Sequence, residues 1–109
     1  MSVSESMFIE IIRGVSSADP ESRTGEADRC IDLLGSYSPV QVRALAAVLS
    51  SLAVVESNSN ALESQLNALL ELGQTGVVKS EDVGAVKNID RSTLTHALAE
   101  YVEDLLADY

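Results

Sequence analysis

Cysteine, aromatic residues and basic residues are all scarce in this chain. Of its 109 residues, one is cysteine, none is tryptophan and one is phenylalanine. The single cysteine, Cys30, cannot form an intrachain disulfide, and this composition favours a reducing compartment. Seven lysine and arginine residues stand against 17 aspartate and glutamate residues, which gives a net charge of −10. A field of that sign repels phosphate backbones and anionic lipids, so we expect neither direct nucleic-acid binding nor membrane binding.

Long apolar runs are also missing. The longest, residues 44–55, is interrupted by Ser50 and Ser51, and a membrane-spanning helix needs about 20 apolar residues. The N-terminal segment carries neither a basic leader nor an unbroken apolar stretch of signal-peptide length. We therefore expect a soluble, cytoplasmic protein with one domain over residues 1–109, which is the usual size of a single domain.

Apolar residues recur at spacings of three and four, which predicts an all-α fold. Asp19-Pro20 and Ser38-Pro39 each pair a capping side chain with a proline suited to the first helical position. We predict helices over residues 3–15, 20–34, 39–56, 62–73 and 80–87, and a last one from Asp90 or Ser92 to 106. Short connections then favour five to six helices in an antiparallel helical bundle or a short HEAT-like array.

Individual segments give more specific predictions about the helices. Residues 39–56 are apolar around most of the helix circumference, which predicts the central helix of the fold. Gly35 is expected to end the helix before it in a left-handed conformation, and Gly73 to close the fourth helix. Ser80 is expected to cap the fifth helix, and Gly76-Val77-Val78 to form a short extended link that packs one valine onto the core.

The residues suited to catalysis or metal binding are isolated from one another. His96 is the only histidine, so a zinc site of the usual type has too few ligands, although Glu100 lies four residues on and shares its helix face. Cys30 falls on an apolar stripe, where cysteines are usually inert packing residues. Glu56 and Glu63 flank one turn and are the best candidates for a carboxylate pair. We expect no enzyme activity, no cofactor and no bound metal.

Acidic residues are concentrated in residues 1–35 and in the last helix, and two groups of them are candidate binding patches. The first, at the corner between the third and fourth helices, holds Glu56, Glu63 and Glu71, and residues 44–78 contain no base. The second, on the last helix, contains Glu100, Glu103, Asp104 and Asp108. Tyrosine beside carboxylates is favoured composition for a protein interface. We expect Tyr101 to face the core, and Tyr109 and Tyr37 to be the exposed tyrosines, with Tyr109 beside the second patch.

The run from Arg43 to Ala53, followed by a turn through Glu56 to Asn60 and a return over Leu62 to Leu72, resembles a HEAT-type helical hairpin. In a short, strongly acidic chain, it is similar in style to the helical immunity proteins with which bacteria neutralise toxins. That resemblance implies a tight complex with a basic toxin domain, often a nuclease, whose active site or nucleic-acid surface is covered by carboxylates.

Three hypotheses follow from the sequence. The first is a non-catalytic immunity or inhibitor protein that is steered to a basic toxin by its acids and docks through a few apolar or tyrosine anchors. The second is a scaffold or adaptor that forms homo-oligomers through an apolar face of the first or third helix. The third is a small enzyme that uses Glu56 with Glu63, or His96.

Overall fold

The computed structural model describes residues 2–109, and this part of the chain is all-α, with no strand. The five α-helices are α1 (Glu5–Val15), α2 (Pro20–Cys30), α3 (Pro39–Val55), α4 (Ser59–Gly73) and α5 (His96–Ala107). Three short 3-10 helices complete the fold: η1 (Ile31–Ser36), η2 (Gly84–Asn88) and η3 (Arg91–Thr93). The predicted fold class is confirmed.

Each α-helix begins where a short polar side chain accepts a hydrogen bond from the first turn. Asp19 accepts from the backbone N–H of Ser22 at the start of α2. Ser38 caps α3, where the side chain of Gln41 accepts from the Ser38 backbone N–H and completes a capping box. The predicted starts at Pro20 and Pro39 are confirmed. The corresponding caps of α1, α4 and α5 are Ser4, Asn58 and Thr95.

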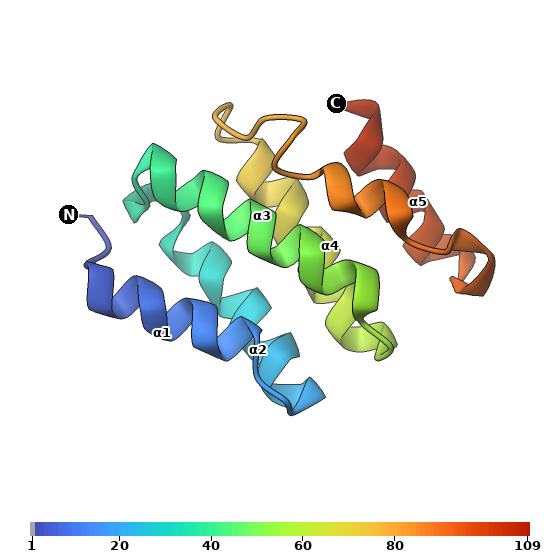
Figure 1. The fold of residues 1–109 in the computed structure, drawn as a ribbon, viewed down its shortest axis with the longest axis horizontal. Helices are drawn as coiled ribbons and strands as arrows, with labels where there is room; N and C mark the ends of the chain where they lie inside the picture. The colour runs from blue at the N-terminus through green and yellow to red at the C-terminus, as the bar shows by residue number, and fades with distance from the viewer. Residues whose placement is uncertain (1) are drawn as a thin grey trace.

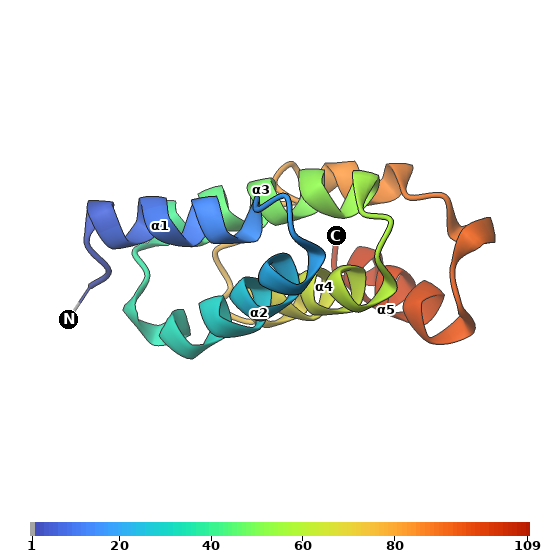
Figure 2. The same ribbon diagram turned by 90° about the horizontal axis from the view of Figure 1, so that it is seen from below.

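The helices form two layers (Figures 1 and 2). The first layer holds α1, α3 and η2, and the second layer holds α2, α4 and α5. The chain reverses direction each time it changes layer, so successive elements are antiparallel and the elements within one layer run the same way. The apolar core lies between the layers, with Leu45 and Leu49 of α3 fully buried against Leu66 and Leu69 of α4 in one cluster.

The central helix is α4 and not α3. Residues 39–55 do form a helix, but the prediction that it lies at the centre of the fold was wrong. α4 packs against α2, α3, α5 and η1, and it buries residues on several sides: Ala61, Leu62, Ser64, Gln65, Leu66, Ala68, Leu69 and Leu72. By contrast, α3 leaves Val40 77% exposed and Val55 78% exposed. Small side chains such as Ala61 and Ala68 allow neighbours to approach α4 closely, and total apolar content does not reveal this property.

The helix predicted over residues 20–34 is shorter than expected. α2 ends at Cys30 and continues as the 3-10 helix η1. Gly35 is not left-handed, because Gly76, with a φ of 82°, is the single residue with positive φ in the described chain. The hydroxyl of the buried Tyr37 donates to the Cys30 carbonyl at 2.7 Å, which satisfies one acceptor at the end of α2 without a glycine cap.

The segment after α4 also differs from its prediction. Val78 of the extended link is buried, as expected. Residues 80–87, however, form a turn and then η2. The side chain that accepts a backbone N–H there is Asp82, which accepts from Lys79, and not the predicted cap Ser80. Asp90 caps the short η3, so α5 begins only at His96, later than predicted.

No helix of residues 2–109 is both long and apolar enough to cross a membrane.

Candidate protein-binding face

Glu56, from the first predicted patch, lies inside the structure. Its side chain is 3% exposed, and both of its carboxylate oxygens accept hydrogen bonds from Arg23 of α2, at 2.7 Å each. Gln65 and the backbone N–H of Asn58 donate to the same carboxylate at 2.8 and 3.1 Å. Burial raises the pKa of Glu56, but these hydrogen bonds and the charge of Arg23 together outweigh it and hold the pKa below its ordinary value.

Arg23 connects this carboxylate to the turn between α1 and α2. Its Nη1 donates to the carbonyl oxygens of Ser17 and Ala18, both at 3.0 Å. The ion pair therefore joins the α1–α2 turn to the corner between α3 and α4. Since Glu56 has these partners, we exclude it from the candidate binding surface, and it does not pair with Glu63, which is exposed on α4.

Tyr37 and Tyr109 are not the exposed tyrosines that the sequence predicted. Tyr37 is 9% exposed and packs edge-on against Phe8, with ring centroids 6.3 Å apart. Tyr109 is half-buried against the core, its hydroxyl lies over Gly73, and burial raises its pKa. Tyr101 packs against the core, as expected, but it is only half-buried and also lines a hollow at the surface. Of the three tyrosines, Tyr101 has the position of an interface anchor.

The acids of the C-terminal helix are on the surface, as their helical positions predicted. Glu100, Glu103, Asp104 and Asp108 are all exposed. Nε2 of His96 lies 3.0 Å from Oε1 of Glu100, and the two side chains are 91% and 61% exposed. Glu71, near the C-terminal end of α4, is half-buried. The acids of α5 thus form an open ridge rather than a pocket.

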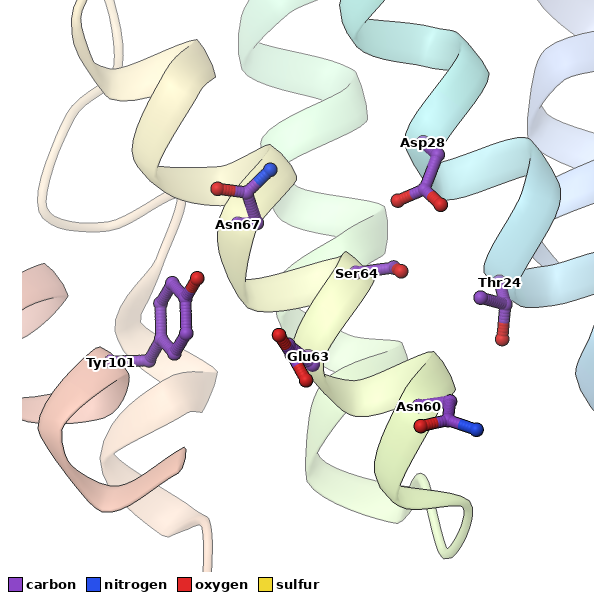
Figure 3. Close-up of a pocket in the computed structure, with 7 residues that line it drawn as sticks. All are labelled: Thr24, Asp28, Asn60, Glu63, Ser64, Asn67 and Tyr101. Carbon is purple, nitrogen blue, oxygen red and sulfur yellow. The ribbon is translucent and has the colours of Figure 1, made fainter. Parts of the chain in front are cut away.

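The second layer carries a polar hollow of about 420 Å³ between α2, α4 and α5 (Figure 3). The residues that line it come from all three helices: Thr24, Asp28, Asn60, Glu63, Ser64, Asn67 and Tyr101. Only Glu63 was selected from the sequence. A signal for the others was present in the polar stripe of α4, where Asn60, Glu63, Ser64 and Asn67 recur at helical spacing. That α2 and α5 complete the hollow follows from tertiary packing, which no local pattern contains.

Basic residues are nearly absent from this face. α4 and α5 contain no lysine or arginine. Of the two arginines on α2, Arg23 is paired with Glu56, and Arg29 is paired with Glu26 at 2.8 Å. The remaining bases lie on α1, on α3 or between residues 79 and 91, among them Arg43, which pairs with Asp82 and Glu81. Neither α4 nor α5 therefore places a lysine or arginine among its exposed carboxylates. We call these carboxylates the acidic face: Glu63, which lines the hollow, and Glu100, Glu103 and Asp104 of α5.

The other chemically reactive groups lie apart from this face. Cys30 is 1% exposed, and burial raises the pKa of its thiol to about 12, so almost no thiolate forms at neutral pH. Within residues 2–109, no three histidine, cysteine, aspartate or glutamate side chains are grouped so that they would hold a metal ion.

Comparison with known proteins returned no match to a family model, to a curated protein or to a solved structure.

Proposed function

We propose that this chain is a binding protein that recognises a basic protein surface through its acidic face, in the manner of an immunity or inhibitor protein. The observation that carries the proposal is the acidic surface of α4 and α5, which no lysine or arginine interrupts, next to a hollow with a half-exposed tyrosine. Cys30 is the single cysteine and forms no disulfide, which accords with action in the cytosol.

The mechanism has two stages. The exposed carboxylates first attract a partner of opposite charge and raise its association rate. Tyr101 and the walls of the hollow then provide a central contact that excludes water, and the α5 ridge forms its charged rim. Where the partner is a toxin that acts on nucleic acid, carboxylates placed on its basic surface compete directly with its substrate.

The first candidate partner is the protein encoded by the gene adjacent to the gene for this chain. Calorimetry measures the affinity of that protein for the wild-type chain and for the double variant Glu103→Gln/Asp104→Asn. The control is Glu5→Gln/Glu10→Gln, which removes the same charge from α1 in the other layer. We expect the α5 variant to bind at least tenfold more weakly and the control to bind as the wild type does. Equal losses in both variants, or an affinity that does not change between low and high salt, would refute the proposal.

Self-association is a second candidate function, and the outer surface of α3 favours it. The outward row of this helix holds the exposed Val40, Ala44, Ser51 and Val55 and the half-buried Ala47, none of which is charged. Two copies of a chain with charge −10 repel each other least through a surface without carboxylates. Sedimentation equilibrium of the wild type and of Val40→Asp/Val55→Asp tests this candidate: a dimer that the substitutions dissociate supports it, and a wild-type monomer refutes it.

A further inference from the structure

The two large faces of the molecule differ in charge and in apolar surface. The first layer forms one of these faces and the second layer forms the opposite one (Figure 2). α1, α3 and η2 contain two acids and three bases, whereas α2, α4 and α5 contain eight acids and two bases. The large apolar residues that are exposed within residues 2–109 all lie on α1 and α3: Met7, Ile9, Val40 and Val55. The first layer therefore presents an apolar face without an excess of negative charge.

This distribution of charge favours a second copy of the chain on the first layer. A basic partner is attracted to the acidic second layer. Arg43, the single charged residue of α3, is already paired with Asp82 and Glu81. Two copies that meet through their first layers keep their second layers outside, separated by two layers of helices, or about 20 Å. That separation exceeds the Debye length of about 8 Å in physiological salt, so the repulsion between two chains of charge −10 is largely screened.

The outward row of α3 matches itself when two copies of the helix run antiparallel. Val40 and Val55 stand at the two ends of the row, 77% and 78% exposed, and smaller side chains lie between them. Two antiparallel copies that cross close to Ala47 bring Val40 of one copy level with Val55 of the other, and Ala44 level with Ser51. The reason is that the two members of each pair lie equally far from the crossing point, at 1.5 Å per residue. A twofold interface requires such a match of one surface with itself.

The face is also large enough for a stable dimer. The molecule measures 41 × 30 × 18 Å, so its large faces span 41 × 30 Å, and a standard interface buries about 800 Å² on each partner. We infer that the chain forms a twofold dimer through antiparallel α3 helices, which leaves its two acidic faces on the outside, each open to a basic partner. The dimer stands without the proposed function, whereas the binding of two partners rests on it.

Single cysteines placed in the row test the register of the dimer. Ala47→Cys should form a disulfide between two copies under mild oxidation, because the twofold axis brings the two thiols together. Val40→Cys should not link to itself, since the two thiols would lie about 22 Å apart along the helix axis. An equimolar mixture of Val40→Cys and Val55→Cys should link through a short thiol–thiol reagent, whereas neither variant should link alone.

The wild type and Glu103→Cys are the controls for this experiment. Cys30 is 1% exposed, so the wild type should give no linked dimer. Glu103→Cys carries a new exposed thiol on α5 in the second layer, and its yield measures random collision. We expect at least tenfold more linked dimer from Ala47→Cys than from Glu103→Cys. Equal yields from these two variants, a Val40→Cys that links to itself, or a wild type that sediments as a monomer would overturn the inference.

The stoichiometry of binding separates this inference from the proposed function. Light scattering of the wild type with the basic partner should give a complex of two chains and two partners, and Val40→Asp/Val55→Asp should give a complex of one chain and one partner. A single partner on each wild-type dimer would refute the claim that both acidic faces are open. A monomeric wild type that binds the partner refutes the dimer and leaves the proposed function intact. A linked Ala47→Cys dimer in a protein with no affinity for the basic partner supports the dimer and counts against the proposed function.

Discussion

At the scale of single residues, the bonds of Glu56 show how far a side chain's role depends on contacts made elsewhere in the chain. Its position beside a turn suggests an exposed acid, and the residue that buries it, Arg23, lies 33 positions away. Nothing in the local sequence marks that pairing, because a glutamate is usually exposed unless a partner from elsewhere in the chain is buried with it. Tyr109 shows the same dependence, since its ring is half-buried against the core with its hydroxyl over Gly73, far away in the sequence.

Replacing Glu56 by glutamine should destabilise the fold substantially. The amide keeps the shape of the side chain but leaves the Arg23 guanidinium without its counter-charge, and breaking a buried ion pair costs about 3 kcal/mol. Urea unfolding at neutral pH measures the loss. Glu103→Gln, which changes an exposed acid on α5, is the control and should shift stability by less than about 0.5 kcal/mol. Equal stabilities of Glu56→Gln and the wild type would contradict the structure.

The same pair should make stability depend on pH. The pKa of Glu56 is held below its ordinary value of 4.5 in the fold, so its contribution is fully present above that pH. The contribution is lost as the pH falls through the lower, folded-state pKa. We therefore expect the stability difference between wild type and Glu56→Gln to shrink between about pH 5 and about pH 2. Unfolding curves across this range test the sign, and a difference that grew on acidification would show that burial, and not Arg23, controls this carboxyl group.

The Cys30 thiol should be unreactive in the folded protein. A rise in its pKa from 9.0 to about 12 lowers the thiolate fraction at neutral pH about a thousandfold, and burial blocks access to the sulfur. A disulfide reagent that reports thiolate release should react slowly with the native protein and at once in denaturant. Because Cys30 is the single cysteine, any fast native reaction would come from this residue and would show that α2 opens readily.

At the scale of elements, the two helix starts that combine a capping side chain with a proline were predictable from the sequence, whereas the end of α2 and the start of α5 were not. Asp19-Pro20 and Ser38-Pro39 fix their starts by chemistry within four residues of the chain. The end of α2 depends instead on Tyr37, whose hydroxyl bonds back to the Cys30 carbonyl after a turn of 3-10 helix. A glycine such as Gly35 only permits a left-handed end, and tertiary packing decides whether that conformation is used.

Replacing glycine by alanine should raise the stability of the protein at one position and lower it at another. Gly25 lies within α2 and a Cβ added there meets no atom within 4 Å, so Gly25→Ala should stabilise the protein by about 1 kcal/mol through helix propensity. Gly76 has a φ of 82° in the turn after α4, so Gly76→Ala should destabilise it by about 1 kcal/mol despite equally open space. Thermal unfolding of both variants gives the two signs, and shifts in the same direction would contradict one of the two conformations.

At the scale of the whole molecule, the candidate site lies where three helices meet, so the sequence contained only part of it. The polar stripe of α4 was visible as a pattern, and Glu63 was selected from it. Asp28 and Tyr101 reach the same hollow only because α2 and α5 flank α4 in one layer (Figure 2). The α5 acids were placed correctly because an amphipathic helix fixes its outer face by periodicity alone.

We expect the carboxylates of the acidic face to lower the free energy of unfolding. Glu103 and Asp104 lie near the C-terminal end of α5, where the helix dipole favours cations and the helix has no basic residue in its last turn. Glu103→Gln/Asp104→Asn should therefore stabilise the protein by about 0.3 kcal/mol per group at low salt, and by less at high salt because the field is screened. Urea midpoints at two ionic strengths measure both effects.

A variant that is more stable and yet binds the basic partner more weakly would show that these carboxylates serve recognition at the expense of helix stability. A variant that is less stable than the wild type at low salt would instead mean that the α5 acids support the fold.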